Sequence, residues 1–202
     1  MVRGYISLGS NIDREKHIKA GLQAIAARWG NLVISNIYES TAIGFSGNPF
    51  YNLVVGFDTI DDVYSVSQQL REIEIANGRP KDSKKFSSRT LDLDLILYGE
   101  LIVNEGRLQL PRTDITQYAF VLQPLAEIAP LLIHPILKIN YQQLWQQMPK
   151  DPSESLFLRK LIRSIPAPIS SKNHATAYAF GCPDSSASPR FDPTRGRNIG
   201  ST

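Results

Sequence analysis

Two aspartates separated by one residue form the most informative pattern in the chain. Asp92 and Asp94 lie in the run LDLDLILY, whose apolar residues at every second position predict a β-strand. Residues two apart in a strand share a face, so both carboxylates are expected on one side, with Leu93, Leu95 and Leu97 on the buried side. Aspartate is depleted in strands and two on one face repel, so a cation between them is expected. Carboxylate oxygens suit Mg²⁺, which completes its shell with water and substrate phosphates.

A basic loop precedes this strand. Arginine grips phosphate oxygens with two donors while carboxylates hold a metal, so loop and strand together favour phosphoryl transfer from a nucleotide–magnesium complex. Each feature alone has a simpler alternative, a solvated strand face or a solvated run of charge. The sequence contains neither G-x-x-x-x-G-K-[ST] nor G-x-G-x-x-G, which argues against P-loop NTPases and protein kinases. The cations of the loop are Arg79, Lys81, Lys84, Lys85 and Arg89.

A second group of candidate residues lies near the middle of the chain. Phe50 and Asn52 share a face of an expected strand, while Tyr51 and Leu53 take the other. An aromatic ring beside an amide can stack on a flat heterocycle and hydrogen-bond its edge. A core phenylalanine beside a turn-capping asparagine explains these residues equally well.

Apolar periodicity predicts the elements that would position these residues. The order β-α-β-β-α-β is the split βαβ arrangement, so the expected fold class is α+β with a ferredoxin-like core. A hairpin at 101–103 and 107–110 follows, then a short helix in AFVLQPLAEIAP interrupted by Pro124, and helices near 140–148 and 154–163. The expected core elements are strands at 2–8, 32–39, 50–58 and 91–98, one helix opened by Asp13 and another opened by the Thr59-x-x-Asp62 pattern.

Composition limits the class of protein. The 202 residues are 42% hydrophobic and 20% charged, which fits one globular domain, expected at 1–163, with a disordered tail at 164–202 rich in proline and serine. No apolar run reaches the ~18 residues of a membrane span, so no membrane partner is expected. A single cysteine and an N-terminus that leads directly into a strand, without a signal peptide's apolar core, predict a reducing, cytoplasmic location.

Four segments together resemble a known family. GSN near the start, NPFYN, SRTLDLDLILYG and AFVLQPLAEIAP are similar, in order and spacing, to the 6-hydroxymethyl-7,8-dihydropterin pyrophosphokinase family of folate biosynthesis. The resemblance implies a monomeric, cytoplasmic, ferredoxin-like enzyme with no nucleic-acid partner. It transfers the β,γ-pyrophosphoryl group of ATP to the hydroxymethyl group of the pterin and leaves AMP. Two Mg²⁺ ions would bind at Asp92 and Asp94, with Asp92 also beside the substrate hydroxyl.

The resemblance also implies roles for individual residues. The catalytic group would be Arg79, Arg89, Asp92 and Asp94. Contacts to ATP would come from Arg71, Glu74, Lys81, Lys85, Leu95, Arg107, Gln109, Arg112 and Thr113. The pterin would be bound by Ser40, Thr41, Ile43, Phe50, Asn52, Phe86 and Phe120.

Some positions depart from the family pattern. Lys85-Phe86-Ser87-Ser88-Arg89 stands where the family commonly has Arg-Trp-Gly-Pro-Arg, Arg112-Thr113 where it has His-Tyr, and Tyr118 where it often has arginine. These differences leave open a paralogue with weakened or altered activity. A ferredoxin-like RNA-binding module is another alternative, although two aspartates on the sheet would repel a phosphate backbone and no RNP-like motif is present.

Overall fold

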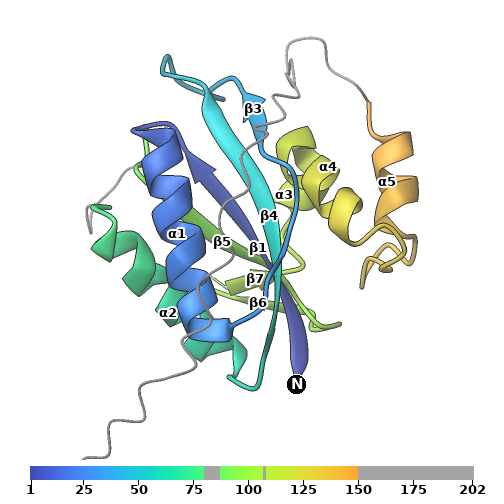
Figure 1. The fold of residues 1–202 in the computed structure, drawn as a ribbon. Coiled ribbons are helices and arrows are strands. Elements are labelled where there is room, and N and C mark those ends of the chain that lie inside the picture. Colours follow the sequence, from blue (N-terminus) through green and yellow to red (C-terminus); the bar gives the residue numbers. More distant parts are fainter. Residues whose placement is uncertain (80–86, 107, 150–202) are drawn as a thin grey trace, which may run out of the picture. The chain divides into compact units, whose positions relative to one another are not determined.

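The computed structural model describes residues 1–79, 87–106 and 108–149. Its main sheet is antiparallel, with strand order β2-β4-β1-β5, and β3 also pairs with β4 (Figure 1). The expected domain boundary at residue 163, the tail and the helix at 154–163 lie outside the described residues. The strands are β1 (Val2–Ser10), β2 (Val33–Ile34), β3 (Tyr38–Ser40), β4 (Phe50–Thr59) and β5 (Asp92–Tyr98).

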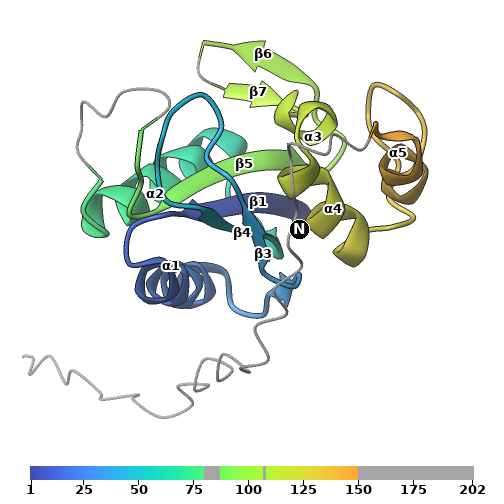
Figure 2. The ribbon, with the colours of Figure 1, turned by 90° about the horizontal axis from the view of Figure 1, so that it is seen from above.

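Helices cover both faces of the sheet (Figure 2). α1 (Arg14–Trp29) and α2 (Val63–Ala76) lie on one face, and α3 (Asp114–Gln117) and α4 (Ala119–Ile128) lie on the other. α5 (Tyr141–Gln147) packs against α4, and β6 (Val103–Glu105) pairs with β7 (Leu108–Leu110) in a separate hairpin. The expected ferredoxin-like α+β fold is confirmed. Over the described residues, every helix is too short or too polar to cross a bilayer.

Each face of the sheet has its own apolar core. On the side of α1 and α2, Leu22 and Ile25 pack with Leu8, Leu53 and other buried residues of the strands. The expected i, i+4 spacing along α1 is what places its apolar residues on one side. The other core is formed by α4 and α5 against the opposite face. Burying each large aliphatic side chain stabilises the fold by about 1.5–3 kcal/mol.

A β-bulge changes the expected alternation along β5. Leu93 and Leu95 are buried on the side of α1 and α2, as expected, but Leu97 belongs to the core on the opposite face. The register shifts between Tyr5 and Ile6 of β1, so that Ile96 becomes an extra residue in β5. A bulge rotates the residues that follow it, and the expectation for Leu97 was therefore wrong.

The expected strand at 32–39 is two short strands. The Ser35 hydroxyl accepts the Val54 N–H at 3.0 Å, and the Asn36 N–H points to the Glu127 carboxylate of α4 at 3.0 Å instead of to the sheet. The Asn36 side chain and the Tyr38 hydroxyl also donate to Glu127, at 2.7 and 2.8 Å. One carboxylate outside the sheet therefore takes the backbone donor of Asn36 that would have continued the strand.

Helix ends and the hairpin differ in detail from the expectations. Asp13 precedes α1 in a left-handed conformation, with φ of 43° and no side-chain cap bond. Asp62 caps α2 by accepting from Tyr64 and Ser65, whereas Thr59 lies outside the cap. Pro124 lies within α4 and does not interrupt it. The hairpin strand expected at 101–103 is displaced toward the turn, at 103–105.

We predict that acid weakens the packing around His134, which is buried in the segment between α4 and α5. Its Nδ1 accepts the N–H groups of Ile136 and Leu137, both at 3.2 Å, so this nitrogen must stay unprotonated. Burial lowers the pKa of His134 below its ordinary 6.5. The unfolded chain therefore binds a proton first, and the stability from neutral His134 is lost as the pH falls below about 6.5.

The measurement is urea unfolding between pH 7.5 and 5.5, compared with His134→Asn, whose amide oxygen replaces Nδ1 as an acceptor and does not titrate. The unfolding free energy of the wild type should decrease relative to that of His134→Asn as the pH falls. Both proteins contain the same carboxyl groups. The comparison therefore removes the contribution of carboxyl groups that titrate in the same pH range. A difference that is independent of pH would contradict the assignment.

Candidate active site

A pocket of about 360 Å³ opens on the sheet face that carries α3 and α4. This volume is in the range of small-molecule sites. Its walls come from the loop after β3, the ends of β1, β4 and β5, and the segments that precede β5, α3 and α4. The lining residues are Ser7, Gly9, Ser40, Thr41, Ile43, Phe45, Phe50, Asn52, Arg79, Ser87, Arg89, Asp92, Asp94, Ile96, Arg112, Asp114, Tyr118 and Phe120.

Strand register builds the floor of the pocket. Gly9 of β1 pairs with Asn52 of β4 on one side and with Asp92 of β5 on the other. Ser7 pairs with Asp94 in the same way. A Cβ at Gly9 would lie 3.5 Å from Asn52 Oδ1 and 3.9 Å from Asp92 Cβ, so the missing side chain leaves an open path between the amide and the carboxylate.

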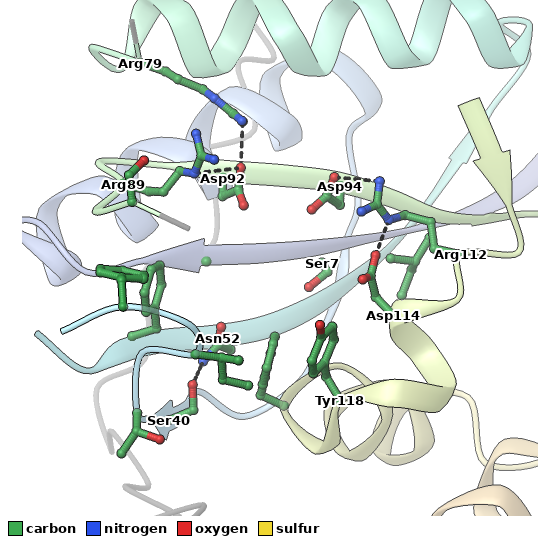
Figure 3. A pocket seen from close by; sticks show the side chains of 18 residues that line it. Ser7, Ser40, Asn52, Arg79, Arg89, Asp92, Asp94, Arg112, Asp114 and Tyr118 are labelled. Carbon is green, nitrogen blue, oxygen red and sulfur yellow. Dashed lines mark hydrogen bonds and ion pairs between the residues drawn. The ribbon is translucent and has the colours of Figure 1, made fainter. Parts of the chain in front are cut away.

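Arginines from separate segments surround the two carboxylates (Figure 3). Arg79, just after α2, donates to Asp92 Oδ1 at 2.6 Å, and Arg89 Nε lies 3.8 Å from the same oxygen. Arg112, just after β7, lies 3.1 Å from Asp94. These cations offset the repulsion between two like charges on one strand face.

Partial desolvation and repulsion both disfavour the charged form of Asp94. Its pKa is raised to about 6, first because the pocket partly removes the carboxyl from solvent and then because the negative charge of Asp92 lies nearby. The Arg112 guanidinium lowers it, but Arg112 also donates to Asp114 at 2.5 Å and is shared between two acids. A divalent cation would relieve this repulsion directly.

The chemistry of the donor set fits Mg²⁺. Two carboxylates with hard oxygens face one pocket, and Mg²⁺ takes one or two carboxylates and completes its octahedron with water and phosphate. Across residues 1–79, 87–106 and 108–149, no cluster of three or more His, Cys, Asp or Glu could hold a metal by itself. Solvent and substrate oxygens are the ligands that would complete such a shell.

Glu74 lies behind the pocket and holds both the start of β5 and the Arg79 guanidinium. The side chain is 3% exposed, accepts the Leu93 N–H at 2.8 Å and forms an ion pair with Arg79. Arg71 approaches its other oxygen at 3.6 Å. Burial raises the pKa of Glu74 to about 7. This carboxyl therefore anchors the start of β5 and aims the Arg79 guanidinium at Asp92.

The opposite side of the pocket is amide and aromatic. Asn52 Nδ2 donates to the Ser40 hydroxyl at 2.9 Å, and both residues are buried. Because Nδ2 is held in this way, Oδ1 faces the space above Gly9 and is able to accept a hydrogen bond. Phe50 and Phe120 supply apolar ring surface to the same cavity.

Two further aromatic rings support those walls. Phe45 meets Phe50 edge to face with ring centroids 6.3 Å apart. Tyr118 stacks on Phe120 at 5.1 Å with an interplanar angle of 18°. Aromatic pairs of these geometries are favourable, so the two phenylalanines are held by ring packing as well as by the backbone.

Most residues suggested by the resemblance meet in this pocket. Of the remainder, Glu74 and Arg71 lie behind it, Leu95 is buried on the face of α1 and α2, and Gln109 and Thr113 are exposed outside the lining. Lys81, Lys85, Phe86 and Arg107 lie outside the described residues. Those that line the pocket are Ser40, Thr41, Ile43, Phe50, Asn52, Arg79, Arg89, Asp92, Asp94, Arg112 and Phe120.

Sequence reasoning missed several lining residues. Ser7 and Gly9 were accessible from the same alternation that identified Asp92, because β1 pairs with β5 and its serine and glycine fall at every second position. Phe45 and Asp114 gave no local signal, since a loop phenylalanine and a helix-start aspartate are ordinary features.

The sequence matches the family model described as 7,8-dihydro-6-hydroxymethylpterin-pyrophosphokinase over residues 5–130. A Haemophilus influenzae 2-amino-4-hydroxy-6-hydroxymethyldihydropteridine pyrophosphokinase is 34% identical over 139 residues, which span 67% of this chain and 86% of that protein. The Pseudomonas aeruginosa protein of the same name is 36% identical over 132 residues, covering 63% and 81% of the two chains.

Solved structures agree on the fold. A Plasmodium falciparum HPPK-DHPS chain superposes with a TM-score of 0.58 at 14% identity, over 72% of this chain. The present chain spans 42% of that longer protein, and at this identity the likeness concerns the fold alone. Family match, curated relatives and fold point the same way: the chain belongs to the 7,8-dihydro-6-hydroxymethylpterin-pyrophosphokinase family and is a pyrophosphokinase of folate biosynthesis.

Proposed function

We propose that the pocket over Gly9 is where this chain transfers the β,γ-pyrophosphoryl group of ATP to the hydroxymethyl group of 6-hydroxymethyl-7,8-dihydropterin, with release of AMP. The observation that carries the proposal is the cross-strand row Asn52–Gly9–Asp92. It places a donor–acceptor amide for a heterocycle next to the carboxylate pair, with no side chain between them. A pterin and a triphosphate can then meet above the glycine.

The pterin would occupy the aromatic side. Phe50 and Phe120 offer ring faces for stacking, and Asn52 Oδ1 accepts an N–H at the edge of the heterocycle. Ser40 keeps the amide in that orientation through the bond to Nδ2. Thr41 and Ile43 complete this wall. The hydroxymethyl group then points along the sheet toward Asp92.

The triphosphate would occupy the charged side. We place the two Mg²⁺ ions implied by the resemblance at Asp92 and Asp94. Ions held by these carboxylates would neutralise phosphate charge and supply Lewis-acid activation of the transferred group. Arg79, Arg89 and Arg112 already surround these carboxylates, and the same guanidinium groups are placed to donate to phosphate oxygens.

The transfer needs no covalent intermediate with the protein. The pterin hydroxyl oxygen forms a bond to the β-phosphorus, and the bond from that phosphorus to the α,β-bridging oxygen breaks, leaving AMP. The hydroxyl proton departs to solvent or to a nearby carboxylate such as Asp92. The residues of the chain hold the two reactants in line and stabilise the charge on the transferred group. Positioning of this kind can be worth ~7 kcal/mol of the barrier.

The surroundings of the enzyme are also part of the proposal. We expect a monomer in the cytoplasm, with a catalytic domain at 1–163 and without nucleic-acid or membrane partners. The single cysteine supports a reducing compartment. Sedimentation of the full chain at several concentrations measures the oligomeric state.

We predict that Asp92→Asn and Asp94→Asn each lower AMP formation about 1000-fold or more, because each removes a charged metal ligand. The assay follows AMP released from ATP and Mg²⁺ in the presence and absence of hydroxymethyldihydropterin. Asp58→Asn is the matched control, since Asp58 pairs with Arg3 at the surface. Wild-type protein that releases no pterin-dependent AMP would leave a paralogue with altered activity or a binding module, and an RNA gel shift would separate those two.

We also predict that Arg89→Ala lowers kcat roughly 100-fold, since it removes a donor aimed at the transferred group. The variant leaves the Glu74 contacts of Arg79 in place. Arg79→Ala should lower kcat at least as much, but it also leaves a buried acid without this partner, so its melting temperature must be measured alongside. Arg28→Ala, which breaks a surface pair with Glu72, serves as the control. Unchanged turnover in both Arg79→Ala and Arg89→Ala would refute the proposed role of these arginines in stabilising the transferred group.

A third prediction concerns Gly9. In Gly9→Val the branched side chain would occupy the gap between Asn52 and Asp92, so kcat/KM for the pterin should fall about 100-fold. The melting temperature should stay the same or rise, because valine favours a strand. Gly9→Ala makes only ordinary contacts and should give a smaller effect. If Gly9→Val loses activity only because it fails to fold, this would count against a role for the open space between Asn52 and Asp92.

A further inference from the structure

We propose that Arg112 competes with a divalent ion for Asp94: its guanidinium contacts this carboxylate and must pass to Asp114 before an ion can bind there. The inference rests on the metal site of the proposed function and deepens it. It assigns to Arg112 control over the metal affinity of the pocket, and to Asp114 the role of the acceptor that makes the exchange possible.

Arg112 is shared between two carboxylates through different nitrogen atoms (Figure 3). Nη1 lies 3.1 Å from Asp94 Oδ1, and Nε donates to Asp114 Oδ2 at 2.5 Å. The backbone N–H of Arg112 donates to the Ile96 carbonyl at 3.1 Å and so fixes the base of the side chain beside β5. Because separate nitrogens make the two contacts, a movement of the Nη1 end releases Asp94 while the bond to Asp114 remains.

The contact of Arg112 with Asp94 opposes metal binding in two ways. The guanidinium takes up a carboxylate oxygen that a metal would use, and its positive charge repels a divalent ion that comes close to it. Arginine keeps this charge throughout the pH range of folded proteins. Histidine, which the family commonly has at this position, is largely neutral above pH 7. The competing charge is therefore a departure of this chain from the family pattern.

Arg79, which contacts Asp92, is held in a different way. It also pairs with Glu74, which is 3% exposed and lies behind the pocket, so a buried acid restrains its guanidinium. Asp114 lines the pocket, and the side chains of Arg112 and Asp114 are 31% and 28% exposed. Partly exposed ion pairs contribute little stability, so Arg112 can exchange partners at low cost. Arg112 is therefore better placed than Arg79 to be displaced by a metal.

The test measures binding of Mn²⁺ to the full chain without nucleotide or pterin. Mn²⁺ takes the same oxygen ligands as Mg²⁺, and electron paramagnetic resonance of the free ion gives its dissociation constant. We expect Arg112→Gln to bind Mn²⁺ about tenfold more tightly than the wild type, because the competing contact and its charge are both removed. Arg28→Gln, which removes an arginine from a surface pair with Glu72, is the matched control and should leave the affinity unchanged.

A double-mutant cycle tests the part of Asp114. In Asp114→Asn the guanidinium loses its charged acceptor and stays on Asp94, so Mn²⁺ binding should weaken. This weakening should be at least threefold larger in the protein with Arg112 than in Arg112→Gln, because Asp114 acts through the arginine. An equal effect in both proteins would mean that Asp114 attracts the ion by its own charge, which overturns the exchange.

A nucleotide should respond to Arg112→Gln with the opposite sign. The probe is the magnesium complex of an ATP analogue with a methylene group between the α- and β-phosphorus atoms. Its affinity should fall about fivefold in Arg112→Gln, because the released guanidinium donates to phosphate oxygens. General damage to the fold would weaken both ligands. A loss of both affinities, or an Mn²⁺ affinity of Arg112→Gln within twofold of the wild type or too weak to detect, overturns the proposal.

A crystal structure of the wild type with Mn²⁺ and the same analogue needs no variant, so it tests the proposal even where Arg112→Gln fails to fold. Arg112 should no longer contact Asp94 and should still contact Asp114. An ion bound at Asp94 beside an unmoved Arg112 overturns the proposal, and a complex without metal at either carboxylate refutes the metal site itself. AMP formation tests the proposed function separately, so an active enzyme whose metal affinity is independent of Arg112 refutes only this inference.

Discussion

Two negative charges held on one strand face are the constraint on which the site depends. Asp92 and Asp94 repel each other, and the protein compensates with arginines from three places: Arg79 after α2, Arg89 before β5 and Arg112 after β7. Because each cation belongs to a different segment, the carboxylate pair is tolerated only when the surrounding fold is complete. The stability of this region and the binding of a metal-bound triphosphate that we propose for it would thus have the same electrostatic origin.

The sheet provides the surface on which those charges work. One face is covered by α1 and α2, whereas part of the other is covered by α3, α4 and α5. The bulge at Ile96 lies at this border, where β5 changes from lining the pocket to packing in the core under α4. Small residues of β1, Ser7 and Gly9, then leave depth above the middle of the sheet. The helices pack on one part of this sheet face, and the part that they leave uncovered forms the pocket.

How far the sequence could predict the structure depended on the range of the interactions involved. Alternation along a strand is local, so it placed Phe50 with Asn52 and Asp92 with Asp94 correctly on shared faces. The helix over 63–76 and its apolar side followed from spacing in the same way. Periodicity carries no signal for a bulge, which depends on a partner strand, and Leu97 was misplaced for that reason.

Other failures of sequence reasoning come from side chains that bind backbone groups far away in the chain. The N–H of Asn36 is taken by a carboxylate 91 residues later, so a continuous strand became two. Asn11, which accepts the Arg89 N–H at 2.7 Å, and Glu74 fix the site through backbone groups in the same manner, and neither role has a sequence motif. Such contacts depend on the assembled fold.

Glu127 of α4 lies outside the pocket, but its contacts help to position residues that line it. This carboxylate holds the hydroxyl of Tyr38, two residues before Ser40, which in turn orients the Asn52 amide. In a deep mutational scan, substitutions at position 127 would resemble binding-site mutations although the residue lies outside the cavity. Resistance to an inhibitor that imitates the heterocycle can therefore arise at a residue that does not line the cavity, through a change in the geometry of the wall and without loss of a contact to the drug.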